Sequence, residues 1–144
     1  MPMTPFAARF PELALKETRS ATIPPGHALP AGDYGFLELY CDEPGCDCRH
    51  VFVQVLRPHT GWTKVWATIS YGWESPEFYR EWSGDPADAP EWAGTRLEPL
   101  QPQSQYAEEL LDLFRFILQS PDYEERLRRH YELFRQSVSE SESQ

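Results

Sequence analysis

The sequence is short of positive charge, and this shortage limits the partners that the protein can bind. Its 144 residues carry 13 lysines and arginines against 23 acidic side chains, so the formal net charge is −10. An acidic surface repels the phosphate backbone of nucleic acids and the head groups of anionic membranes. We therefore expect neither nucleic acid nor a membrane as a partner.

Long apolar runs are also lacking. No stretch reaches the ~18 apolar residues of a membrane span. Residues 1–20 hold five charged side chains in place of the apolar core of a signal peptide, namely Arg9, Glu12, Lys16, Glu17 and Arg19. A cytoplasmic protein is the expectation, and stable disulfides are rare in that compartment.

The motifs that mark common catalytic sites are missing too. The sequence has no H-E-x-x-H motif, no G-x-S-x-G motif and no phosphate-binding glycine loop. The H-x-E and P-C-x-x-C halves of the zinc-deaminase pattern are absent as well. These absences favour a protein without catalytic residues, and no residue is predicted to bind an organic cofactor.

The sequence holds only 3 cysteines, and all of them fall within one short stretch. Cys41, Cys46 and Cys48, together with His50, give the spacing C-x4-C-x-C-x-H. The segment Glu43-Pro44-Gly45-Cys46 suits a tight turn, because proline fixes the backbone and glycine supplies a positive φ. Apolar runs flank the stretch, so it is predicted to be the tip of a β-hairpin.

We interpret this hairpin tip as a metal site, with zinc as the ion. Thiolate sulfur and imidazole nitrogen bind zinc in a tetrahedron, and structural zinc sites use four protein ligands. In extended backbone Cys46 and Cys48 point to one face, and the turn folds Cys46 back toward Cys41. Two alternatives stay open: reduced or redox-active cysteines, and a disulfide with one free thiol.

The fourth metal ligand is predicted to be His130, with His50 as the alternative. His50 follows the last cysteine closely, but three ligands spaced two residues apart span about 13 Å along an extended strand. They cannot meet at one ion unless the backbone bends. His130 lies on the inward stripe of a predicted amphipathic helix, where a hydrogen-bonded core histidine is the competing interpretation. Asp47, His59 and water are the remaining candidates.

Alternating apolar residues predict three strands, over residues 34–41, 49–57 and 62–71. The simplest connection is an antiparallel meander of three strands, or of four if the N-terminal region adds one. Strands followed by helices favour an α+β fold over a parallel arrangement. One domain is predicted over residues 1–136, and a disordered polar tail over residues 137–144.

Serine and proline pairs predict where helices begin. Ser75-Pro76 and Ser120-Pro121 each combine a capping serine with proline at the first helical position. Ser104 caps the helix before the last one, so the C-terminal part is predicted to be a helical pair packed on the sheet. Residues 85–102 form an acidic, proline-rich connector that we expect to wrap the surface or cover a pocket.

Three segments together resemble a family of small uncharacterised bacterial proteins. They are the C-x4-C-x-C-R pattern at residues 41–49, the S-Y-G-W-E segment at residues 70–74, and R-L-R-R-H-Y at residues 126–131. The resemblance covers most of the chain after Gly32 and implies no substrate or mechanism. The family pattern has arginine at the place of His50, which weakens His50 as a ligand.

The sequence thus predicts a small cytoplasmic domain with a structural zinc site, non-catalytic and acting through protein contacts. One alternative is a zinc-dependent hydrolase-type enzyme whose open coordination position activates water, with Asp42, Glu43 or Asp47 as the base. Another is a thiol-based metal or redox sensor, in which the neighbouring Arg49 promotes the reactivity of Cys48.

Overall fold

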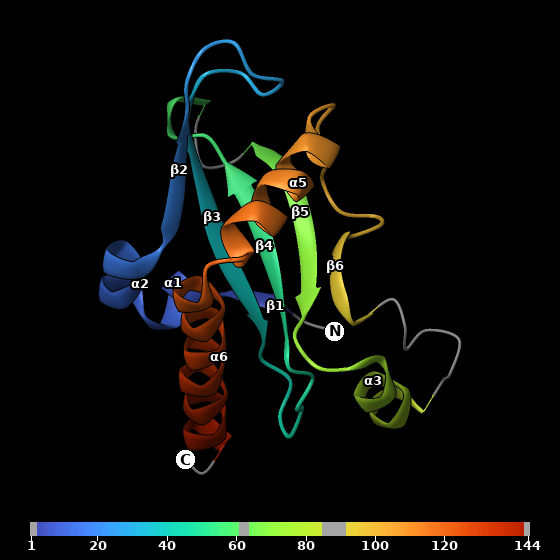
Figure 1. Cartoon of the computed structure of the whole chain (residues 1–144). Helices are drawn as coiled ribbons and strands as arrows, with labels where there is room; N and C mark the ends of the chain where they lie inside the picture. Colours follow the sequence, from blue (N-terminus) through green and yellow to red (C-terminus); the bar gives the residue numbers. More distant parts are fainter. Residues whose placement is uncertain (1–2, 61–63, 85–91, 143–144) are drawn as a thin grey trace.

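The computed structural model describes residues 3–60, 64–84 and 92–142. An antiparallel sheet of six strands lies at its centre (Figure 1). The strands are β1 (Met3–Pro5), β2 (Arg19–Ile23), β3 (Gly32–Cys41), β4 (His50–Leu56), β5 (Val65–Gly72) and β6 (Gly94–Leu97). From β2 to β6 they are neighbours in chain order. The predicted α+β fold is confirmed, with more strands than the three or four expected.

On the side of β3 that does not pair with β4, two short strands replace a single long one, and two short helices separate them. β1 pairs with the end of β3 at residues 39–41, and β2 pairs with its beginning at residues 32–36. Between them lie α1 (Phe6–Arg9) and α2 (Pro11–Glu17). The chain leaves the sheet after Pro5, and Pro11 occupies the first position of α2, which proline tolerates well.

β6 comes from the acidic connector and completes the other edge of the sheet. It pairs antiparallel with β5, and Glu98 N donates to Thr68 O at 2.9 Å just beyond it. The Gln103 side chain then accepts from Thr68 N at 3.0 Å and donates to Thr68 O at 2.9 Å. This part of the connector therefore satisfies backbone groups that an open edge would leave unpaired. The remaining connector residues, 85–91, lie outside the described residues.

The helices after Ser75 and Ser120 begin at the predicted prolines, whereas the helix after Ser104 begins at Ala107 and has no side-chain cap. Ser75 Oγ accepts a hydrogen bond from Phe78 N at 3.2 Å and so caps α3 (Pro76–Ser83). A 3₁₀ turn, η1 (Pro58–Thr60), lies between β4 and β5, and α5 (Ala107–Leu118) precedes α6 (Pro121–Glu142). Within the described part of the chain, no helix is both long enough and apolar enough to cross a bilayer.

α6 continues to Glu142, whereas the sequence predicts a disordered tail over residues 137–144. Val138 is buried, which anchors this last segment to the rest of the molecule. The Ser137 hydroxyl donates to Phe134 O at 2.7 Å and accepts from Arg9 of α1 at 3.2 Å. These contacts explain why the polar residues join the helix.

One face of the sheet is covered by α5 and α6 (Figure 1). Val51, Val53 and Val55 point to this face, because every second residue of a strand lies on the same side, and all three are fully buried. Glu38 stands opposite Val53 across the β3–β4 pair and so shares this apolar face. A buried carboxylate here needs a polar partner. His130 of α6 is one such partner of Glu38.

Candidate metal centre

The three cysteines meet at the loop that joins β3 to β4. Cys41 ends β3, and Cys46 and Cys48 lie in the loop; their ligand atoms all lie within 4.8 Å of one another. All three are free thiols, with Cys41 and Cys48 fully buried and Cys46 half-buried. This confirms that the sequence spacing brings the three side chains into one group that can hold a metal ion.

The predicted turn makes this convergence possible. Cys46 N donates to Glu43 O at 3.2 Å, and Gly45 has a φ of 72°. Arg49 also has a positive φ, of 47°, which is uncommon for a residue with a side chain. The backbone therefore bends between Cys48 and the start of β4 instead of continuing as an extended strand.

Each thiol has a different electrostatic environment. The pKa of Cys41 is lowered to about 6, mainly because the Cys48 thiol donates to its sulfur and also because Glu43 N donates at 3.4 Å. The same contact raises the pKa of Cys48, and burial raises the pKa of Cys46. Without a metal, the group therefore carries its negative charge on Cys41.

The donor set fits a soft or borderline metal ion. With zinc–sulfur bonds of about 2.3 Å, a tetrahedral site places its sulfur atoms roughly 3.8 Å apart. The cysteine sulfurs already lie within 4.8 Å of one another, so only a small closure of the loop is needed. Thiolate ligands select zinc, copper(I) and iron–sulfur centres over magnesium or calcium.

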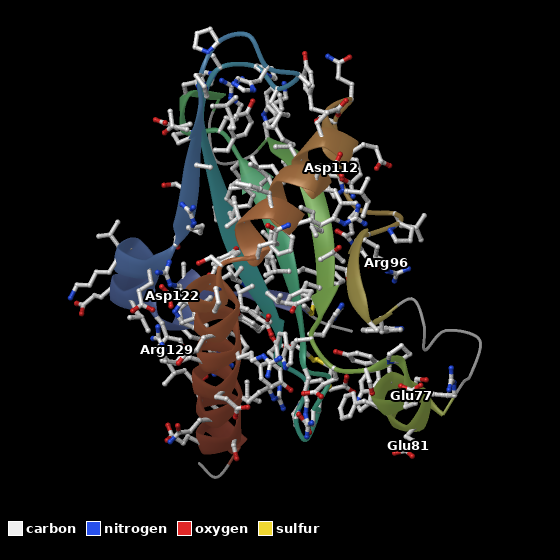
Figure 2. All side chains as sticks on the ribbon, in the orientation of Figure 1. Glu77, Glu81, Arg96, Asp112, Asp122 and Arg129 are labelled. Atoms are coloured by element: carbon white, nitrogen blue, oxygen red, sulfur yellow. The ribbon has the colours of Figure 1, made fainter. Side chains whose placement is uncertain are left out.

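The structure places His130 away from this group. Its Nδ1 lies 2.7 Å from Glu38 Oε1, and its Nε2 lies 2.7 Å from Glu17 Oε1. The ring is fully buried and stacks on Phe6 with centroids 4.2 Å apart. Arg129, labelled in Figure 2, joins the same carboxylate of Glu17 at 3.0 Å. His130 as fourth ligand remains a prediction, and this geometry favours the hydrogen-bonded core histidine that competes with it.

His50, the alternative fourth ligand, also lies outside the group formed by the cysteines. Its ring packs against Phe52 and Trp92, and its Nε2 is hydrogen-bonded to Ser70 Oγ. Burial lowers the pKa of His50 to about 3, so the ring is neutral at physiological pH. Within the described structure its buried Nδ1 has no hydrogen-bond partner. Of the two histidines, His50 is therefore the one with a free ring nitrogen.

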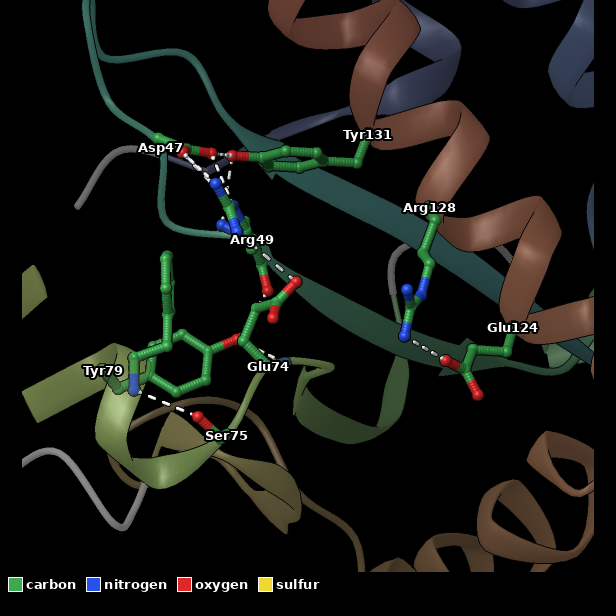
Figure 3. Close-up of polar contacts among 9 residues, drawn as sticks. Asp47, Arg49, Glu74, Ser75, Tyr79, Glu124, Arg128 and Tyr131 are labelled. Carbon is green, nitrogen blue, oxygen red and sulfur yellow. Dashed lines mark hydrogen bonds and ion pairs between the residues drawn. The ribbon is translucent and has the colours of Figure 1, made fainter.

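The remaining ligand candidates are less favourable. His59 lies in η1, at the opposite end of β4 from the cysteine loop. Asp47 is engaged elsewhere: its carboxylate accepts from Tyr131 OH at 2.9 Å and from Arg49 at 3.0 Å (Figure 3). Among the described residues, no carboxylate or histidine joins the three cysteines as a fourth donor.

No family model, curated protein or solved structure matches this chain. The resemblance to a small bacterial family stays a prediction. The site must therefore be interpreted from its own residues.

Two residues of α6 that the sequence argument missed hold the cysteine loop. Tyr131 OH accepts from Arg49 N at 3.0 Å as well as donating to Asp47. Arg135 Nη1 and Nη2 donate to the carbonyl oxygens of Cys41 and Glu43 at 2.7 and 2.9 Å. Tyr131 and Arg135 are four residues apart and thus on one helix face, which was the available signal.

A tyrosine of α3 holds the other side of the loop. Tyr79 OH donates to Arg49 O at 2.7 Å, and the Arg49 side chain pairs with Glu74 at 3.6 Å (Figure 3). The Tyr79 ring is fully buried. The loop is thus fixed from both α3 and α6, as expected where ligand positions must be kept.

Proposed function

We propose that the protein is a non-catalytic domain in which Cys41, Cys46 and Cys48 hold a structural zinc ion, and that it acts through protein contacts. The observation that carries this proposal is the convergence of the three cysteine sulfurs within 4.8 Å. Their conversion to thiolates by the ion would fasten the end of β3 to the start of β4. Metal-binding free energy would then stabilise the folded state.

The environment of the site supports a structural role over catalysis. The enzyme alternative relies on a nearby carboxylate as the base for a metal-bound water. Asp47 is occupied by Arg49 and Tyr131, and Asp42 accepts from Thr4 Oγ1 at 2.5 Å. Two of the three carboxylates nearest in sequence are therefore committed to holding the loop and β1.

An apolar hollow supports the expectation of protein contacts. It encloses about 360 Å³ between α1, α2 and β3, and its apolar lining includes Pro11, Ala14, Leu15 and Leu37. The Leu15 side chain is 89 % exposed. Contiguous exposed apolar surface, to which Leu15 contributes here, is typical of surfaces that bind other proteins.

Metal analysis of protein purified without chelator tests the proposal. We expect about one zinc per chain and thiols that react only after a chelator is added. Replacing Cys46 with serine should remove most of the zinc and lower the melting temperature while the fold persists. Metal-free protein with three freely reactive thiols would contradict the proposal.

The same preparation identifies the fourth ligand. His50→Gln and His130→Gln each remove one candidate nitrogen, and zinc content is measured for both. Loss of zinc in one variant alone assigns the ligand to that histidine. Full zinc content in both indicates water or another donor.

A thiol-based redox sensor is the second candidate, favoured by the environment of Cys41. Its pKa of about 6 makes it a thiolate at neutral pH, and thiolates are the reactive form. Full burial of Cys41 opposes this reading, because an oxidant must reach the sulfur. Rapid alkylation of Cys41 in protein that contains no metal as purified would favour the sensor.

A further inference from the structure

Arg135 of α6 donates hydrogen bonds to the backbone at Cys41, the first of the three cysteines. Its guanidinium is forked over two carbonyl oxygens, with Nη1 at 2.7 Å from Cys41 O and Nη2 at 2.9 Å from Glu43 O. The side chain is half-buried, so its charge is only partly screened by water. A cation is thereby fixed beside the cysteine loop by geometry and not by a flexible surface contact.

The charge of a loaded site explains why a cation belongs there. A divalent ion with three thiolates carries a net charge of −1, and two of the sulfurs are fully buried. An uncompensated buried charge is costly. The neighbouring ionisable groups do not supply the compensation: Asp42, Glu43 and Asp47 are acidic, and Arg49 is paired with Asp47.

We propose that Arg135 sets the metal affinity of the cysteine site by balancing the negative charge of the three-thiolate centre. This inference rests on the metal site of the proposed function. Arg135 contacts the backbone of a ligand and not the ion itself, so it is a positioning residue. Because it projects from α6, metal loading and the docking of that helix on the loop strengthen each other.

Variants of α6 separate the charge from the hydrogen bonds. Arg135→Gln removes the charge, whereas Arg135→Lys keeps it but cannot fork over two carbonyls. Tyr131→Phe removes the hydrogen bonds of the Tyr131 hydroxyl to Arg49 N and Asp47 without changing charge. Arg128→Gln is the matched control, because Arg128 lies on the same helix and pairs with Glu124 at 2.6 Å and not with the cysteine loop in the described structure.

Zinc dissociation constants are measured for each variant by competition with a chromogenic chelator. We expect Arg135→Gln to weaken zinc binding roughly 10- to 100-fold, the range found when outer-shell partners of a metal site are removed. Arg135→Lys should remain close to the parent and so rescue the loss. Arg128→Gln should equal the parent, and cobalt spectra should show unchanged ligands in Arg135→Gln.

Two results would overturn the inference. Parent-like affinity in Arg135→Gln shows that the charge is unimportant. Equal losses in Arg135→Lys and Tyr131→Phe show that a helix–loop clamp, and not charge, sets the affinity. Should Arg135→Gln fail to fold, a tenfold loss in Arg135→Lys overturns the inference by itself. Absence of zinc binding in the parent is a different failure, because it rejects the proposed function before any variant is compared.

Discussion

Replacing His130 with glutamine tests whether this residue is a ligand or a structural link. Both of its ring nitrogens lie 2.7 Å from carboxylate oxygens, one on Glu38 of β3 and one on Glu17 of α2. Both ring nitrogens are thus within hydrogen-bond distance of a carboxylate oxygen. The side chain therefore joins three elements that are distant in sequence.

The expected loss of stability follows from burial. The His130 side chain is 0 % exposed and that of Glu38 is 3 % exposed. Leaving a buried polar group without its partner costs about 1–3 kcal/mol, and a hydrogen bond to a charged group contributes about 1.5–3 kcal/mol. Glutamine can reach one carboxylate but not both, and Tyr40 OH still donates to Glu38 at 2.7 Å. We therefore expect a loss of about 2–3 kcal/mol.

Thermal unfolding of metal-loaded and metal-free protein measures this loss. A loss of that size lowers the melting temperature by roughly 4–12 °C in a chain of this length. The drop should be the same with and without metal, and zinc content should be unchanged. His27→Gln, in an exposed loop, is the control. A variant that loses its zinc while the metal-free melting temperature stays constant would refute the structural role and identify His130 as a ligand.

Two further predictions concern pH and packing. The pKa of Glu17 lies below its ordinary value of 4.5, mainly because of its hydrogen bond with His130. The ionised Glu17 carboxylate therefore stabilises the folded protein above about pH 4.5, and this stabilisation is lost as the pH falls through the lowered pKa. Glu17→Gln should flatten this acid limb in denaturant unfolding between pH 3 and 6, and identical limbs would reject the link. At Gly72 a Cβ atom would collide with Trp92 O, so Gly72→Ala should cost roughly 1–3 kcal/mol. Gly35→Ala, where the nearest atom is 3.7 Å away, should melt close to the parent, and equal effects would contradict the packing argument.

The strands and helices that the sequence predicted are those with strong local signals. Val51, Val53 and Val55 repeat with the period of a strand, and Ser75 with Pro76 marks a helix start; both signals are confirmed. β1, β2 and β6 have three, five and four residues, too short for a clear period. Their pairing depends on partners elsewhere in the chain, which local patterns do not contain.

In the candidate site, too, the local features were predictable from the sequence and the distant contacts were not. Cysteine spacing and turn residues are local, and the predicted convergence of Cys41, Cys46 and Cys48 is confirmed. The supports from Tyr131 and Arg135 lie more than eighty residues away, with separations of 84 and 94 for their contacts to Asp47 and Cys41. Such contacts follow from how α6 crosses the sheet, which depends on the whole fold.

Alternation along β3 also bears on the position of His130. Tyr34, Phe36, Glu38 and Tyr40 alternate along one strand, so the carboxylate of Glu38 had to face the same apolar side as three aromatic rings. A buried carboxylate and a buried histidine each need a partner. An inward acid on a strand and an inward histidine on the helix that covers it therefore predict each other. Glu38 therefore offers His130 a partner that competes with the thiolates, and His130 as the fourth ligand stays a prediction.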